Sequence, residues 1–181
     1  VLGDKANATR PEIEQILISN SKGVDEETFE RELYVIRRRI EKAAAAAGVG
    51  QLYLASLSCR SIIYKGMMLA QDVAEFYPDL MDERFESAFA IYHQRYSTNT
   101  FPQWWLAQPF RMLAHNGEIN TLKGNLNWMK SHEIRMASGT FGDMAEDIKP
   151  IVASGSSDSA ALDAVFEVLV RAGRSAPMAK T

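Results

Sequence analysis

The chain has 181 residues, and 20 Lys and Arg against 23 Asp and Glu give it a formal net charge of −3. Hydrophobic residues make up 46% and charged residues 24%, a balance typical of a globular domain and not of a disordered one. The sequence pI of about 5.7 argues against a basic nucleic-acid-binding protein. The single cysteine, Cys59, excludes an intrachain disulfide and a cysteine-based zinc finger, and it indicates a reducing compartment.

The two ends of the chain are informative in themselves. The sequence begins with Val1 and ends at Thr181, shortly after an apolar periodic stretch and a proline. Neither end has the character of a natural terminus, and no linker divides the chain between them. We therefore expect residues 1–181 to be part of one domain of a longer protein.

Periodicity predicts both kinds of secondary structure. In chain order we expect a strand at 13–18, a helix at 26–47, a hairpin of strands at 52–58 and 61–64, a short helix or irregular connection at 72–80, strands at 85–97 and 110–113, and helices at 121–136 and 159–172. This order predicts an α+β fold in which locally paired strands are covered by helices. The Arg37-Arg38-Arg39 cluster is interpreted as a solvated helix face with charge pairs, not as a nucleic-acid site.

Asn116 and Gly117 lie in the segment LAHNGEIN, after a predicted strand. Asn-Gly is a common tight-turn pair because both residues tolerate positive φ, so a structural turn is one interpretation. The other interpretation is an oxyanion hole, in which the Asn amide and the Gly N–H point at one oxygen. His115, next to this pair, is interpreted as structural.

Arg95 and Asp158 are the charged candidates for ligand binding. Arg95 ends an apolar run, and its guanidinium either reaches from a strand end to water or holds a carboxylate, with Thr98 as a neighbouring donor. Asp158 stands before a predicted helix and either satisfies free helical N–H groups or accepts a ligand ammonium group. Combined with an oxyanion hole, these groups suit an amino acid with a reacting side-chain amide.

Residues 93–125, HQRYSTNTFPQWWLAQPFRMLAHNGEINTLKGN, resemble the signature stretch of the glutaminase domain of glutamate synthases. The resemblance is to the large (alpha) subunit or its ferredoxin-dependent counterpart. Segments at 31–43, 52–73 and 154–179 are similar to the same family, so the resemblance covers most of the chain. Other class II glutamine amidotransferases share the general scheme.

The resemblance implies an N-terminal-nucleophile hydrolase fold, an αββα sandwich that this chain would contain in part, truncated at both ends. It implies hydrolysis of glutamine to glutamate and ammonia through a cysteinyl thioester. The ammonia would be channelled to 2-oxoglutarate for reductive glutamate synthesis. Arg95 and Thr98 match the α-carboxylate site, Asn116 and Gly117 match the oxyanion hole, and Asp158 matches the acid that receives the α-ammonium group.

The resemblance also implies FMN and an iron–sulfur cluster elsewhere in the full-length protein, with no cofactor or metal in this chain. The expected partners are glutamine, the remaining domains of the same polypeptide, and a small NAD(P)H-oxidising subunit or ferredoxin. Neither nucleic acid nor a membrane is expected as a partner. The expected compartment is the cytoplasm, or the plastid stroma for a ferredoxin-dependent enzyme.

The nucleophile is where the sequence departs from the family. The family uses a cysteine at the mature N-terminus, activated by its own α-amino group, whereas Cys59 is internal. Arg60 could lower the pKa of a displaced nucleophile, but Cys59 is interpreted as a small residue of the core or of a sheet surface. We therefore expect the chain to start after the nucleophile and to be inactive alone.

Three alternatives to a glutamate synthase fragment stay open. One is another class II amidotransferase, serving amino-sugar, purine or asparagine synthesis, which residues 101–120 argue against. Another is a nucleophile-less domain that binds glutamine as a sensor. The last is a structural module in which Arg95, Asn116 and Asp158 only stabilise loops.

Overall fold

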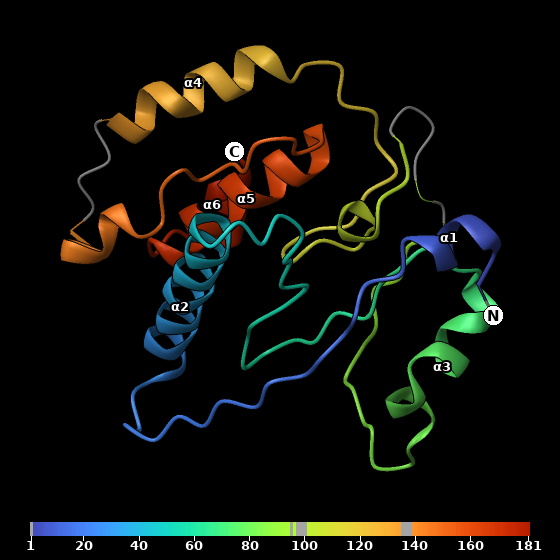
Figure 1. The fold of residues 1–181 in the computed structure, drawn as a ribbon. Coiled ribbons are helices and arrows are strands. Elements are labelled where there is room, and N and C mark those ends of the chain that lie inside the picture. The colour runs from blue at the N-terminus through green and yellow to red at the C-terminus, as the bar shows by residue number, and fades with distance from the viewer. Residues whose placement is uncertain (1, 95, 97–100, 135–138) are drawn as a thin grey trace.

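The computed structural model describes residues 2–94, 96, 101–134 and 139–181. Its α-helices are α1 (Asp4–Ala8), α2 (Glu26–Ala46), α3 (Val73–Phe76), α4 (Lys123–Ile134), α5 (Asp158–Arg171) and α6 (Ala176–Lys180). Short 3-10 helices are η1 (Ala70–Asp72), η2 (Pro78–Met81), η3 (Trp104–Leu106) and η4 (Gly142–Glu146). Helices α2, α5 and α6 gather on one side with α4 beyond α5, while α1 and α3 lie on the other side (Figure 1).

The α+β prediction, and with it the partial αββα sandwich, is wrong for this structure. The described residues contain no β-strand, and the described parts of the segments predicted as strands are coil with bends. Strand-forming side chains indicate a segment that suits a half-buried pleated surface, but a strand also needs a partner within hydrogen-bonding reach. Here the partners are side chains instead: Cys59 N–H donates to Glu30, and Ile63 N–H donates to Ser56 Oγ.

The three long helices were predicted correctly because their signals are local. Asp25 caps α2 by accepting a hydrogen bond from the Thr28 N–H at 3.0 Å, and Ser157 caps α5 by accepting one from the Ala160 N–H at 3.2 Å. Gly48, with φ of 75°, ends α2 in the left-handed conformation that favours glycine. The short helices α1, η3 and α6 were not anticipated.

The core lies between α2, α5 and the loop that carries η4. Its buried members are Tyr34, Val35, Phe141, Ile148, Ile151 and Val168. Within it, the rings of Tyr34 and Phe141 are tilted against each other with 5.9 Å between centroids. A core of this kind fixes the relative position of α2 and α5, on which the functional site depends.

A second buried cluster connects α1 and α3 to η3. The Trp104 indole donates to the Ala6 carbonyl at 3.2 Å, and its ring lies 5.7 Å from that of Phe76. Gly66 is required beneath this indole, because a Cβ there would come within 2.5 Å of the Trp104 ring. No helix within the described ranges is long and apolar enough to cross a membrane.

Candidate active site

An open pocket of about 340 Å³ lies at the N-terminal end of α5. Its walls come from the loop before α5, from the segment before α4 and from the coil around η3. The lining residues are Phe101, Gln103, Leu106, Ile119, Asn120, Thr121, Leu122, Gly155, Ser156, Ser157 and Asp158. Of the residues predicted to form the site, Asp158 lines this pocket.

Asp158 is the first residue of α5. Its Oδ1 accepts hydrogen bonds from the Ser159 N–H at 2.6 Å and from the Ser159 hydroxyl at 3.1 Å. The capping position itself belongs to Ser157, so Asp158 is not needed as the helix cap. The carboxylate therefore combines one local hydrogen-bonding role with a position on the pocket wall.

Asn116 and Gly117 lie just before the pocket-lining residues 119–122. Both are exposed, and the Asn116 side chain has no hydrogen bond to any of the described residues. Gly117 is not at positive φ, so the pair does not form the tight turn that Asn-Gly favours. The Asn116 amide is thus free to bind a ligand, but neither residue lines the pocket in this structure.

Arg95 and Thr98 lie outside the described residues. The neighbouring Tyr96 is described, and its hydroxyl donates to the Gln103 carbonyl at 3.0 Å and accepts from the Gln103 N–H at 2.7 Å. Gln103 is one of the residues that line the pocket.

Side chains that the sequence analysis did not select hold the segment before Asn116. Gln108 contacts both backbone groups of His115: its Oε1 accepts from the His115 N–H at 2.8 Å, and its Nε2 donates to the His115 carbonyl at 3.1 Å. The His115 ring in turn lies 2.7 Å from Ser159 Oγ on α5. The structural role predicted for His115 is therefore specific: its ring joins this segment to the helix that carries Asp158.

Asp163 holds the same segment at residues 111–113, which precede His115. Its carboxylate accepts hydrogen bonds from the N–H groups of Arg111 at 3.3 Å, Met112 at 2.8 Å and Leu113 at 3.2 Å. Burial raises the pKa of Asp163 to about 6, although the backbone hydrogen bonds and the Arg111 charge oppose the shift. The carboxylate is therefore ionised at neutral pH and can accept all three bonds.

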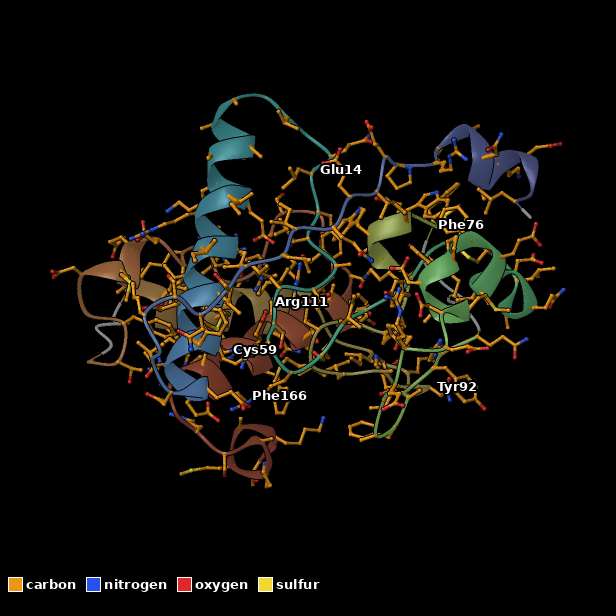
Figure 2. The ribbon with its side chains drawn as sticks, turned by 90° about the horizontal axis from the view of Figure 1, so that it is seen from below. Glu14, Cys59, Phe76, Tyr92, Arg111 and Phe166 are labelled. Carbon is orange, nitrogen blue, oxygen red and sulfur yellow. The ribbon has the colours of Figure 1, made fainter. Side chains whose placement is uncertain are left out.

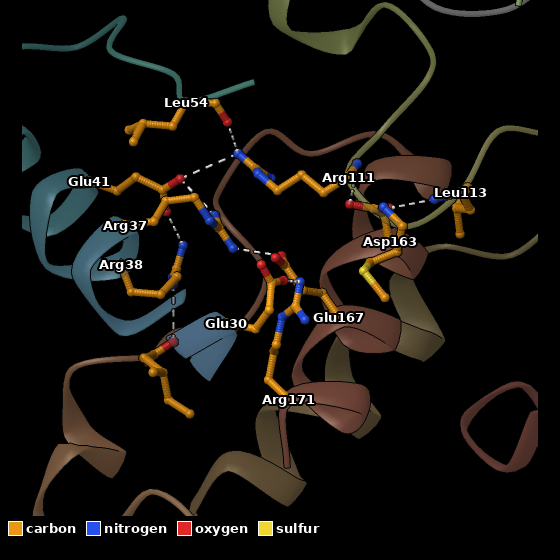
Figure 3. Close-up of polar contacts among 12 residues, drawn as sticks. Glu30, Arg37, Arg38, Glu41, Leu54, Arg111, Leu113, Asp163, Glu167 and Arg171 are labelled. Atoms are coloured by element: carbon orange, nitrogen blue, oxygen red, sulfur yellow. Dashed lines mark hydrogen bonds and ion pairs between the residues drawn. The ribbon is translucent and has the colours of Figure 1, made fainter. Parts of the chain in front are cut away.

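A buried ionic network joins α2 to α5 (Figure 3). Arg37 lies 2.6 Å from Glu167 and 2.8 Å from Glu41, and Arg171 lies 2.6 Å from Glu30. Arg38 donates to the Ile148 and Pro150 carbonyls. The solvated-face prediction is thus wrong for Arg37 and Arg38, which are buried, whereas Arg39 is exposed and pairs with Asp147.

Spacing in α5 was the signal that could have found this network. Ser159, Asp163, Glu167 and Arg171 recur every four residues and so share one face of the helix. Each of them contacts another element: Ser159 contacts His115, Asp163 contacts residues 111–113, Glu167 contacts Arg37, and Arg171 contacts Glu30. A polar face with this regularity in an otherwise apolar helix is turned inward here, where hydrophobic periodicity alone predicts that it faces solvent.

Cys59 does not have the surroundings of a nucleophile. It is exposed, on coil near α2 (Figure 2), and not in the core or on a sheet. Residual desolvation of the thiol, together with the Glu30 carboxylate, raises the pKa of Cys59. Arg60, which could have lowered it, is paired with Glu26 and Glu27. The described residues contain no group of three or more His, Cys, Asp or Glu suited to a metal ion.

Comparison with known proteins identifies the family. The model of the class-II glutamine amidotransferases matches residues 1–181. The chain is 67% identical over 180 residues to the large chain of an NADPH glutamate synthase from Azospirillum brasilense, covering 99% of this chain and 12% of that protein. It is 48% identical over 176 residues to a chloroplastic ferredoxin-dependent glutamate synthase from Oryza sativa, covering 97% of this chain and 11% of the relative.

A third relative has a similar identity and coverage. The large chain of the NADPH glutamate synthase from Bacillus subtilis is 47% identical over 174 residues, covering 96% of this chain and 11% of the relative. The chain thus spans about an eighth or less of the length of these curated relatives. The match over its whole length places the chain in the class-II glutamine amidotransferase family.

Proposed function

We propose that this chain forms the amide-binding part of the glutaminase domain of a glutamate synthase. The observation that carries the proposal is the connection between Asp158, on the wall of the pocket, and the Asn116-Gly117 segment through the 2.7 Å contact of His115 with Ser159. Asp158, the acid for an ammonium group, and Asn116, the amide for an oxyanion, therefore lie on two segments that contact each other. The identity of 67% to a glutamate synthase large chain supports the same assignment.

In this proposal each candidate residue has one chemical task. Arg95, with Thr98, binds the α-carboxylate of glutamine, and Asp158 binds its α-ammonium group. Asn116 and the Gly117 N–H stabilise the oxygen that becomes negative when the side-chain amide is attacked. The attacking thiolate is a cysteine at the mature N-terminus of the full-length protein, which gives a thioester and ammonia, and water then releases glutamate.

The ammonia is proposed to combine with 2-oxoglutarate in another part of the full-length protein, where reduction gives a second glutamate. The iron–sulfur cluster proposed for that reduction does not fit this chain, because such clusters are held by several cysteines and the sequence has one. The FMN is proposed to bind in the same other part of the full-length protein. The proposed electron donor is a small NAD(P)H-oxidising subunit or ferredoxin. The proposed compartment is the cytoplasm or, for a ferredoxin-dependent enzyme, the plastid stroma.

The test uses full-length protein and the variant Asp158→Asn, with Asp143→Asn as its control. Asp143 is an exposed aspartate in η4, so the control makes the same chemical change away from the pocket. A charge-assisted hydrogen bond contributes about 1.5–3 kcal/mol, so Asp158→Asn should raise the glutamine KM about 10- to 100-fold. Glutamine hydrolysis that is absent in the wild type, or a KM equal to that of the control, would refute the proposal.

A further inference from the structure

The segment that leads to Asn116 and Gly117 is held mostly by side chains. Among the described residues between 108 and 117, the one backbone–backbone hydrogen bond runs from the Phe110 N–H to the Leu113 carbonyl, at 2.9 Å. Side-chain hydrogen bonds to the backbone of this segment come from Gln108, His93 and Asp163, and Ser159 contacts the His115 ring. The position of the segment therefore depends on a few specific polar groups.

Gln108 makes a two-point contact that needs both a donor and an acceptor on one side chain, which an amide supplies. It accepts from the His115 N–H and donates to the His115 carbonyl, at 2.8 and 3.1 Å. These two bonds fix the peptide groups on both sides of His115, and Asn116 is the next residue. A carboxylate of the same shape would keep the first bond but would place an anion against the carbonyl oxygen.

Asp163 fixes the other end of the segment to α5. Three consecutive N–H groups, of residues 111–113, converge on its carboxylate, which is 1% exposed. The charged groups around this carboxylate include the buried Lys65 and Arg111 as cations, and Glu167 on α5 as an anion. The cations have no acceptor and cannot compete for the three N–H groups. Glu167 does not compete either, because it is paired with Arg37.

We propose that Gln108 and Asp163 are positioning residues for amide hydrolysis, which fix the backbone that carries Asn116 and Gly117. This inference rests on the proposed function, because it assigns the two side chains a role in the same site. An oxyanion hole acts only if its donors are already placed where charge develops. Misplacement of such a group by about 1 Å can cost 100-fold in rate.

The experiment measures the reaction of full-length protein with a diazoketone analogue of glutamine that alkylates the nucleophile. The variants are Gln108→Glu and Asp163→Asn, with Gln71→Glu and Asp143→Asn as matched controls at exposed positions. The limiting first-order rate constant of inactivation does not depend on how much protein is folded. Loss of folded protein therefore cannot imitate a positioning defect.

We expect this rate constant to fall about 10- to 100-fold in both variants, with the half-saturating analogue concentration little changed. The controls should react like the wild type. Amide hydrogen exchange should become faster at Met112 in Asp163→Asn and at His115 in Gln108→Glu. Exchange at Val35 and Val168, in the buried core, should stay slow and so show that the fold is retained.

The possible failures can be told apart. A wild type that neither hydrolyses glutamine nor reacts with the analogue refutes the proposed function, and the catalytic role of the two residues with it. A reactive wild type with unchanged rate constants in both variants refutes the positioning role alone. Slower inactivation accompanied by fast exchange at Val35 and Val168 assigns the two residues to the stability of the fold, which also overturns the inference.

Discussion

Arg37 on α2 and Glu167 on α5 should show a large coupling energy in a double-mutant cycle. The nitrogen and oxygen of this ion pair lie 2.6 Å apart, and the two side chains are 4% and 6% exposed. Burial alone would lower the pKa of Arg37, but the charges of Glu167 and Glu41 more than reverse this and raise it. The arginine is therefore charged at any accessible pH, and its removal leaves Glu167 buried without its cation.

The two single variants should differ in cost. Arg37→Met should destabilise the domain by about 3–5 kcal/mol, the cost of leaving a buried charge unpaired. Glu167→Leu should cost less, about 1–3 kcal/mol, because Arg37 keeps its 2.8 Å ion pair with Glu41. The double variant should be close to the wild type, since well-packed apolar residues can replace a buried ion pair at little cost. The expected coupling energy is therefore the sum of the two single costs, about 4–8 kcal/mol.

The stabilities in this cycle are measured by amide hydrogen exchange in α2 and α5 of the full-length protein. Exchange reports on these helices separately from other domains. The free energies of opening for wild type, both single variants and the double variant give the coupling directly. The exposed pair of Arg39 with Asp147 is the control, because surface ion pairs contribute about 0–1 kcal/mol. Additive costs at Arg37 and Glu167 would show that the two side chains do not pair.

Four further changes test other parts of the description. Asn116→Ala should lower the glutaminase kcat about 10²- to 10³-fold, as the loss of one oxyanion donor does, in steady-state assays. Arg95→Ala should raise the glutamine KM, and an unchanged KM would contradict its carboxylate role. Gly66→Ala should destabilise the domain by about 1–3 kcal/mol in exchange measurements, because its Cβ would meet the Trp104 ring at 2.5 Å. Asp163 has a folded pKa of about 6 against 3.8, so folding takes up a proton between these values. The stability of the wild type relative to Asp163→Asn should therefore fall by up to about 3 kcal/mol as pH rises from 4 to 6 in unfolding titrations, and stay constant above.

The sequence predicted the helices well and the strands badly, for one physical reason. A helix closes its hydrogen bonds within four residues, so the caps Asp25 and Ser157 and the left-handed Gly48 can be found locally. A strand depends on a partner far along the chain. The run at 85–97 has strand-forming side chains, yet Phe89 and Ile91 are 76% and 65% exposed in the described structure.

Charged residues were the second difficulty. Hydropathy patterns place charged side chains outside, and a pattern of this kind in α5 gives no reason to select Glu167 or Asp163 as buried residues. In the structure both acids are buried, at 4% and 1% exposure, because partners on α2 and on residues 111–113 compensate them. Pairing of this kind depends on two elements at once, and a pattern within one helix does not reveal it.

The sequence indicated the candidate ligand-binding residues but not the side chains that hold them in place. Asp158 was placed at a helix start by its local context, and the structure adds the pocket beside it. Asn116 and Gly117 were selected as an oxyanion pair, a role that stays a prediction. Gln108 and Asp163 escaped selection because their partners are backbone groups, which carry no sequence signal of their own.

Helix α5 connects these observations. Its first turn supplies Asp158 to the pocket, and the face spaced by four residues supplies Ser159 to His115, Asp163 to residues 111–113 and Glu167 to α2. An α-helix rises 1.5 Å per residue, so these attachment points have fixed separations along one rigid rod. The proposed acid for the ammonium group and the segment that carries the proposed oxyanion donors are therefore held by the same element. Since binding groups act only when their mutual geometry is fixed, the packing of α5 against α2 is part of the site's chemistry as well as of the fold.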